Sequence, residues 1–247
     1  RVLLRDRSVP NDPGTIGSMR ALIVQHEHDG PGGLMAEHLV ARGYEVEVLR
    51  VMQQGSTHSE VEYPDPTGYD VIVPLDSVHG VYDTDVIGSW VHRELDMLRT
   101  AHEAGVPMFG ICFGAQALTT ALGGSVEKAP AFEIGWYHYD TDTADIPAGP
   151  WFTWHGDRCL LPPGVTELAR TELCTQAFRA GSTVGVQFHP EVTRDLVEAW
   201  VSQCPPSYFA DRGVSADDVL GGFDAHGDVA THQAAALFDW FLDEVAA

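Results

Sequence analysis

The chain has little positive charge: its 247 residues include 14 lysines and arginines against 36 aspartates and glutamates, and Lys128 is the only lysine. A formal net charge of -22 argues against binding to nucleic acid or to an anionic membrane, because both require basic patches. The acidic surface is best explained by solubility. No apolar run approaches the roughly 20 residues that a membrane-spanning helix needs, and no secretory signal is evident at the N-terminus.

Cysteine is also scarce. Cys112, Cys159, Cys174 and Cys204 are widely separated and form no CxxC pair, so the sequence predicts neither a disulfide framework nor a zinc knuckle. A reduced, cytoplasmic setting is therefore expected, with no cofactor and no metal.

The first 18 residues contain proline, glycine and aspartate without periodicity, and a strong predicted strand begins after Met19. We expect residues 1–18 to be a disordered leader or a segment foreign to the natural chain. Residues 19–247 are then expected to form one domain, which is within the usual size range.

Strands and helices alternate over residues 20–122. Buried strands are predicted at 20–25, 70–75 and 106–111, and an alternating strand at 45–50. Amphipathic helices are predicted at 32–42 and from about 84 to 104. This alternation predicts an open, mostly parallel α/β sheet with helices on both faces.

The pattern changes after Gly124. Short strand-like runs at 135–139, 166–171 and 183–188 are separated by Pro/Gly turns, which indicates an antiparallel extension of the sheet. Helices are then predicted at 194–202, 215–220 and 232–245.

Cys112 stands between the predicted strand 106–111 and a helix of small residues, and Gly110 and Gly114 flank it closely. This strand–turn–helix arrangement lifts a nucleophile out of a sheet and places it at a helix N-terminus, where a thiolate and an oxyanion are both stabilised. Taken alone, however, a cysteine at the end of an apolar strand is more often a core residue.

A second motif supplies the partners that a catalytic cysteine needs. The predicted strand 183–188 ends at His189, and Glu191 follows two residues later. Strand ends are where catalytic groups gather in an open α/β sheet. His189 can take the proton of Cys112, and Glu191 can fix the imidazole tautomer.

Together, Gly-Ile-Cys-Phe-Gly-Ala-Gln at 110–116 and Gly-Val-Gln-Phe-His-Pro-Glu at 185–191 resemble the class I glutamine amidotransferase family. Residues 132–136, 154–157 and 176–178 resemble the branch similar to the amidotransferase domain of GMP synthase, here standing alone. The resemblance extends over roughly residues 19–245. It implies a flavodoxin-like sheet and a Cys-His-Glu triad that releases ammonia from L-glutamine through a γ-glutamyl thioester.

The resemblance also implies further site residues. Backbone N–H groups of Phe113 and Ser77 would form the oxyanion hole. Gln116 would hold the substrate glutamine, and the backbone near His155 and Gly156 would face its amino-acid end. Because no second domain is evident, the ammonia acceptor would belong to a synthase or ligase partner protein.

One segment departs from the family pattern. The oxyanion loop usually reads Gly-Gly-Pro, whereas this chain has Asp76, Ser77 and Val78. A serine would be strained if that position required a positive φ. A carboxylate at Asp76 would oppose a developing negative charge unless it pointed away.

That departure keeps a second hypothesis open, a stand-alone hydrolase of a γ-glutamyl amide or a related small molecule. A third hypothesis, a non-catalytic regulatory module, is disfavoured by the intact triad. The run His26-Glu-His28-Asp29 resembles a set of metal ligands, but no matching distal ligands are evident.

Overall fold

The computed structural model describes residues 18–205 and 207–247. The predicted leader lies outside this part of the chain except for Ser18, so the predicted domain boundary stays a prediction. Within the described residues, no helix has both the length and the apolar character needed to cross a membrane.

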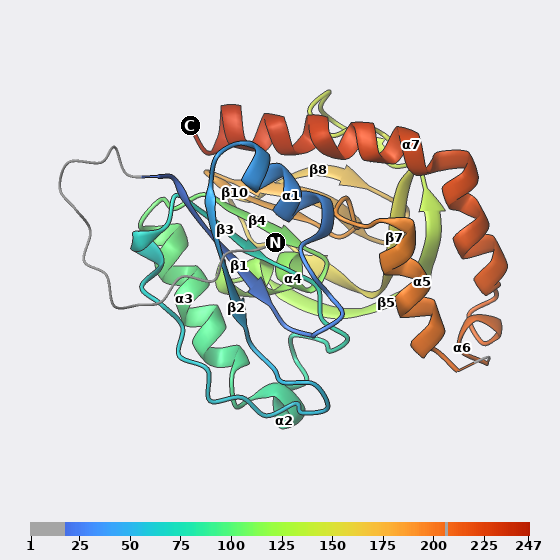
Figure 1. Ribbon diagram of the computed structural model, residues 1–247, viewed down its shortest axis with the longest axis horizontal. Helices are drawn as coiled ribbons and strands as arrows, with labels where there is room; N and C mark the ends of the chain where they lie inside the picture. The colour runs from blue at the N-terminus through green and yellow to red at the C-terminus, as the bar shows by residue number, and fades with distance from the viewer. Residues whose placement is uncertain (1–17, 206) are drawn as a thin grey trace.

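An eight-stranded sheet forms the centre of the molecule (Figure 1), in the order β2-β1-β3-β4-β10-β9-β8-β6. The strands from β2 to β10 in this order pair in parallel, and β9, β8 and β6 continue the sheet in antiparallel pairing. The bounds are β1 Arg20–Gln25, β2 Glu45–Arg50, β3 Val71–Pro74, β4 Met108–Ile111, β6 Asp140–Thr141, β8 Thr166–Arg170, β9 Thr175–Ala180 and β10 Thr183–Val186.

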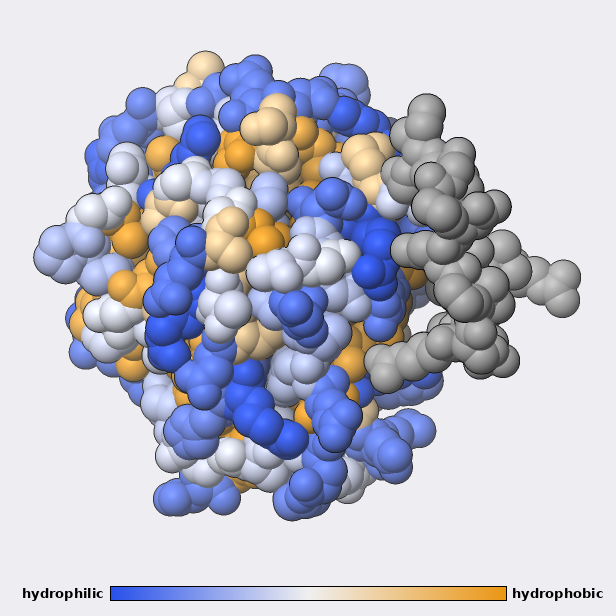
Figure 2. Space-filling view, turned by 90° about the vertical axis from the view of Figure 1, so that its left-hand side faces the viewer, coloured by the Kyte–Doolittle hydropathy of each residue, from blue (hydrophilic) through white to orange (hydrophobic). Residues whose placement is uncertain are grey.

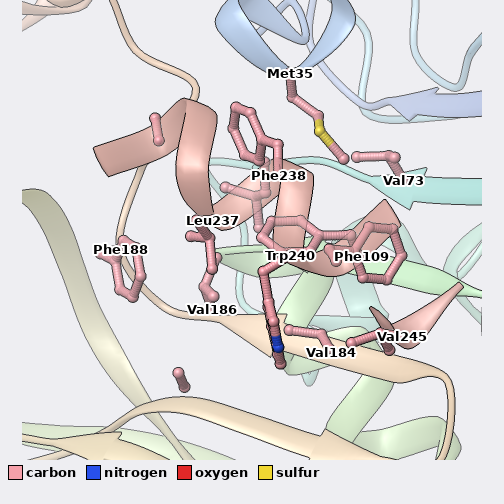
Figure 3. Packing of buried hydrophobic residues seen from close by; sticks show 14 of the residues in the cluster. Met35, Val73, Phe109, Val184, Val186, Phe188, Leu237, Phe238, Trp240 and Val245 are labelled. Atoms are coloured by element: carbon pink, nitrogen blue, oxygen red, sulfur yellow. The ribbon is translucent and has the colours of Figure 1, made fainter. Parts of the chain in front are cut away.

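Alternate residues of the central strands point to opposite sides of the sheet. Both sets are apolar and pack against helices, so the sheet is buried on both faces. On one face, Ile23, Val73 and Phe109 pack against α1 (Gly33–Ala41), α7 (Ala216–Trp240) and the π-helical turn Phe241–Val245. Figure 3 shows the centre of this cluster, with Phe109 and Phe238 among the packed side chains. The rings of Phe109 and Phe238 meet edge-on with centroids 5.8 Å apart.

The other face is covered by α3 (Val91–Glu103) and α4 (Phe113–Ala121), together with the short helix α2 (Thr84–Ile87) and the 3-10 turn Pro66–Gly68. Leu22, Ile72 and Met108 face this second cluster. The intervening residues Ile23, Val73 and Phe109 face the first. The predicted two-sided burial of the sheet is therefore confirmed.

A separate two-stranded antiparallel sheet consists of β5 (Ser125–Tyr137) and β7 (Trp151–Leu160). It lies at one end of the molecule beside α5 (Arg194–Gln203), α6 (Ser207–Ala210) and the first part of α7 (Figure 1). The antiparallel extension was thus predicted correctly, but residues 135–137 belong to this separate sheet. Strand β7 was not predicted, because its Trp-His-Gly-Asp segment lacks a clear apolar alternation.

Two helix predictions were wrong. The predicted helix from about 84 to 104 is interrupted at Gly88–Trp90, where Trp90 leaves the helical conformation with φ -136° and becomes fully buried. The two predicted C-terminal helices are one helix of 25 residues, α7, despite its internal glycines. Gly222 has a packing role, since a Cβ there would collide with the indole ring of Trp136.

The molecular surface agrees with the acidic composition. The face drawn in Figure 2 is mostly hydrophilic, with smaller hydrophobic areas between the polar side chains. Among the described residues, the most exposed large hydrophobic side chain is that of Val78, with 82% relative exposure.

Candidate active site

Cys112 occupies a sharp turn between β4 and α4. Its backbone has φ 51° and ψ -105°, and within the described residues it is the one non-glycine residue with positive φ. Such strain persists only where the surroundings enforce it, and it is concentrated at functional sites. Gly114 allows the turn to pack against the sheet, because a Cβ there would collide with the carbonyl group of Pro74. The predicted nucleophile turn therefore exists in the structure.

The topology brings His189 to the same edge of the sheet. Strands β4 and β10 are parallel neighbours, with Ile111 paired to Val186, so the residues that follow them meet at their carboxyl ends. The backbone N–H of His189 donates to the Phe152 carbonyl at 2.8 Å, which ties the segment to β7. A ring nitrogen of His189 and the Cys112 sulfur lie within 4.8 Å of each other.

Glu191 holds the imidazole ring. Its Oε1 lies 2.8 Å from Nδ1 of His189, and both side chains are almost fully buried. Nε2 of His189 is buried and has no hydrogen-bond partner. Because Glu191 occupies Nδ1, the unpartnered Nε2 is the nitrogen available to Cys112. The structure thus brings the three residues of the predicted triad together.

The local electrostatics favour a neutral thiol and a protonated imidazole. Burial raises the pKa of Cys112 well above its ordinary value, and the carboxylates of Asp76 and Glu191 raise it further. Burial alone would lower the pKa of His189, but the charge and hydrogen bond of Glu191 outweigh it and raise that pKa to about 9. The Cys112 thiol therefore ionises readily only if the negative charge near it, from Asp76 and Glu191, is reduced or moved away.

Asp76 is the source of much of this charge. Its carboxylate lies within 4.8 Å of both the Cys112 sulfur and a ring nitrogen of His189, so it does not point away from the reacting groups. The loop after β3 is held there by a hydrogen bond of 3.0 Å between Nδ1 of His26 and the Asp76 carbonyl.

His26 and Glu94 form a buried ion pair behind this loop. Nε2 of His26 lies 2.9 Å from Oε2 of Glu94, which also accepts a hydrogen bond from Tyr63 at 2.9 Å. Burial lowers the pKa of His26, but Glu94 outweighs this and raises it to about 9. Sequence reasoning noticed His26 and missed Glu94, which stands 68 residues away in α3.

Glu27 is a further buried carboxylate beside the loop. Its Oε1 accepts hydrogen bonds from the Ser77 hydroxyl at 2.8 Å and from the Val78 N–H at 3.2 Å. Burial raises the pKa of Glu27 to about 7, with His26 lowering it and Asp76 raising it. The sequence does hint at Glu27, because it stands just after the apolar strand 20–25, where polar side chains often belong to a site.

The predicted oxyanion donors have a defined setting. Phe113 is the first residue of α4, and its backbone N–H lowers the pKa of the Cys112 thiol. On the loop, the Val78 N–H is occupied by Glu27, which leaves the Ser77 N–H as the predicted second donor. Ser77 does not have a positive φ, so serine at this position carries no left-handed strain.

Cys112 opens into a pocket of about 530 Å³. The three predicted substrate-binding residues, Gln116, His155 and Gly156, all line it. Oε1 of Gln116 is buried without a partner and is available to a ligand. The His155 ring is occupied on both sides, at 3.0 Å from the Asp157 carbonyl and 3.2 Å from Glu133. Its contribution to a ligand would therefore come from the backbone, as predicted.

Gln187 was missed as a site residue. Its Nε2 lies 3.4 Å from the Cys112 sulfur and its Oε1 lies 3.5 Å from Nε2 of Gln116. It thus links the nucleophile to a predicted substrate-binding side chain. Gln187 stands two residues before His189 in an extended segment, where alternate residues share a face. This spacing could have predicted that both side chains point toward Cys112.

Two groups of potential metal ligands exist in the described part of the chain. They are Asp76 with Cys112 and His189, and Glu133 with His155 and Cys174. The run at 26–29 does not form such a group among the described residues. Both ring nitrogens of His26 are bonded, one to the Asp76 carbonyl and the other to Glu94.

The family described as glutamine amidotransferase class-I matches residues 32–199, more than half of the chain. The protein therefore belongs to the class I glutamine amidotransferases, cysteine enzymes that act on the amide C–N bond of glutamine. The predicted family and enzyme class are confirmed.

Curated relatives include the glutamine-hydrolyzing GMP synthases of Nitrosomonas eutropha, 40% identical over 111 residues, and of Desulfotalea psychrophila, 38% identical over 108 residues. Each match covers 38% of this chain and 21% of the relative. The matched segment thus spans about a fifth of these relatives.

Solved structures confirm the predicted fold. A glutamine amidotransferase from Thermotoga maritima superimposes with a TM-score of 0.79 at 23% identity, covering 92% of this chain and 100% of the other. One from Methylobacillus flagellatus gives a TM-score of 0.81 at 22% identity, covering 93% and 96%.

Proposed function

We propose that this protein hydrolyses the side-chain amide of L-glutamine through Cys112, His189 and Glu191. The resting pair first loses the proton of the imidazolium. His189 then takes the thiol proton as the sulfur attacks the amide carbon, and it gives this proton to the departing ammonia. The product is a γ-glutamyl thioester. Water, deprotonated by His189, cleaves the thioester and releases glutamate, while the proton returns to the sulfur.

One observation carries this proposal: the buried His189 has Nδ1 bonded to Glu191 at 2.8 Å, and its unpartnered Nε2 is the nitrogen left for the strained Cys112. Such an arrangement fixes the tautomer in which Nε2 accepts a proton. The Phe113 and Ser77 N–H groups would stabilise the tetrahedral oxyanion, and one donor of this kind is typically worth ~3–4 kcal/mol of barrier.

The ammonia would pass to an acceptor on a synthase or ligase partner protein. The curated relatives are glutamine-hydrolyzing GMP synthases of which this chain matches about a fifth, which supports an acceptor activity beyond the matched segment.

A second candidate is hydrolysis of a γ-glutamyl amide that has a cationic amine as its leaving group. Asp76 favours it, since a carboxylate beside the reacting atoms would attract an ammonium group and repel an anionic one. Glu27 adds a second carboxylate to the same pocket.

The test is ammonia release from L-glutamine by wild type and by Cys112→Ala, with γ-glutamyl amides as parallel substrates. We expect release from glutamine by wild type alone. Turnover of γ-glutamyl amides without glutamine turnover would establish the second candidate. Equal release above background by wild type and Cys112→Ala would overturn the mechanism. Background release by both proteins on every substrate would support a non-catalytic module.

A further inference from the structure

We propose that Asp76, Cys112 and His189 form a binding site for a divalent transition-metal ion, Zn²⁺ in particular, which blocks the nucleophile reversibly. Inhibition by the bound ion rests on the proposed function, whereas binding of the ion does not. The site arises because this chain places a carboxylate in the loop that faces the nucleophile.

The three residues supply a suitable set of ligand atoms. A carboxylate oxygen, a thiol sulfur and an imidazole nitrogen all lie within 4.8 Å of one another. Bonds of 2.0–2.3 Å in a tetrahedral zinc site place ligand atoms about 3.3–3.8 Å apart. The remaining difference is on the order of 1 Å, which rotation of the Asp76 and Cys112 side chains can close.

The histidine is prepared for coordination. Its Nε2 is buried without a hydrogen-bond partner, and its side chain has no exposed surface. Its Nδ1 is held at 2.8 Å by the Glu191 carboxylate. A metal-bound histidine commonly donates its second ring N–H to a carboxylate in this way, and that contact orients the ring and raises its basicity.

The second group of potential ligands lacks this preparation. Oε2 of Glu133 already receives Nε2 of Gln176 at 2.7 Å and lies 3.2 Å from Nε2 of His155. The other nitrogen of His155 is bonded to the Asp157 carbonyl. A metal ion there would have to displace these contacts. Cys174, the cysteine of this second group, is therefore the control for Cys112 in the metal-binding experiment.

The ligand chemistry defines the class of ion. Sulfur and imidazole nitrogen select Zn²⁺ and similar ions over Mg²⁺ and Ca²⁺, which prefer oxygen ligands. Glu27, Asp29, Asp83 and Asp157 also line the pocket, against Lys128 and Arg212, so the pocket attracts cations. The fourth coordination position faces this pocket and can be filled by water.

Binding requires no oxidant. The S–H bond of Cys112 breaks, its proton passes to solvent, and the sulfur electron pair forms the bond to Zn²⁺. His189 contributes the lone pair of neutral Nε2 and releases any proton held there. Chelation of the metal reverses both steps and restores the thiol.

The experiment uses metal-free protein and Co²⁺ as a spectroscopic substitute for Zn²⁺, with calorimetric titration of Zn²⁺ in parallel. We expect one site per chain, with a thiolate-to-Co²⁺ charge-transfer band that Zn²⁺ removes and Mg²⁺ does not. Cys112→Ser should abolish the band and Cys174→Ser should retain it. Asp76→Asn should weaken Zn²⁺ binding at least tenfold, since a first-sphere ligand is lost.

A measurement on wild type alone guards against variants that fold poorly: Zn²⁺ should slow alkylation of Cys112, as followed by mass spectrometry, and chelation should restore the rate. The proposal is overturned if wild type shows no thiolate band, or if the band survives in Cys112→Ser or disappears in Cys174→Ser. Unchanged affinity in Asp76→Asn, or Cys112 alkylation that ignores Zn²⁺, would overturn it as well. None of these readouts depends on glutamine turnover, so failure here is distinguishable from failure of the proposed function.

Discussion

The carboxylate of Asp76 lies within 4.8 Å of the sulfur of Cys112 and raises the pKa of that thiol. At the corresponding position the family resemblance leads one to expect glycine, which has no side chain and no charge. This chain thus places a negative group directly beside its own nucleophile. The resting thiol is kept protonated, and we therefore expect a low basal rate of the proposed glutamine hydrolysis.

Replacing Asp76 by asparagine removes this charge with little change of shape. The pKa values of Cys112 and His189 should both fall, because Asp76 raises each of them. We expect higher basal ammonia release near neutral pH, by about tenfold for each pKa unit by which the thiol falls. In a pH profile of kcat/KM, the rising limb should move to lower pH than in wild type.

The matched control is Asp29→Asn, because Asp29 lines the same pocket but is not one of the groups clustered around the Cys112 sulfur. Its rising limb should stay at the wild-type pH. An unshifted limb in Asp76→Asn would show that Asp76 does not control ionisation of the nucleophile.

Glu191→Gln should retain the fold and lose most of the activity. A glutamine can donate to Nδ1 of His189 and so favour the wrong tautomer, and it no longer stabilises the imidazolium. We expect kcat to fall by about 10²–10⁴-fold. Steady-state ammonia release measures this, with Glu198→Gln as the control because Glu198 forms an exposed ion pair with Arg194. Near-wild-type kcat in Glu191→Gln would contradict the orienting role.

The buried pair of His26 and Glu94 makes stability depend on pH. The pKa of His26 is raised from 6.5 to about 9 on folding, so the pair stabilises the protein fully below pH 6.5 and loses this contribution as pH rises through 9. The loss is on the order of 3 kcal/mol. Urea unfolding over this range should show it.

Glu94→Gln tests that assignment, because it keeps a hydrogen-bonding side chain and removes the charge that raises the pKa of His26. The decrease in unfolding free energy between pH 6.5 and 9 should be smaller than in wild type. The raised pKa of His189 contributes to both proteins, so the difference reports the charge of His26 together with its effect on Glu27. Parallel stability curves would show that His26 is not charged in the folded protein.

Two adjacent glycines test the packing of α7. Gly222→Ala would force a Cβ into the indole of Trp136, whereas a Cβ at Gly221 would meet open space. We expect Gly222→Ala to destabilise the protein by about 1–3 kcal/mol. Gly221→Ala should stabilise it by up to about 1 kcal/mol, because alanine favours helix. Denaturant midpoints measure both, and equal shifts would refute the contact.

The α/β order and the positions of Cys112, His189 and Glu191 could be predicted from the sequence, because each depends on a local pattern. Buried strands β4 and β10 end at Ile111 and Val186, and the residues of the predicted triad lie just beyond these ends. Parallel pairing of β4 and β10 then brings Cys112 and His189 together, as the rule for carboxyl strand ends predicts.

Contacts between distant segments could not be predicted in the same way. No local sequence pattern predicts that Glu94 contacts His26. Nor does the sequence explain the glycine at position 222 inside a helix, because the reason is its close contact with Trp136. The sequence did identify Asp76 as unusual. Only the structure shows that its carboxylate faces the sulfur.

The central claim is that Cys112 attacks glutamine and carries the γ-glutamyl group. The most direct measurement is mass spectrometry of enzyme quenched with acid during turnover of L-glutamine. We predict a γ-glutamyl adduct on the peptide that contains Cys112, formed by wild type and absent from Cys112→Ser. Glutamine turnover with no adduct on Cys112, or with the adduct on another residue, would contradict the mechanism.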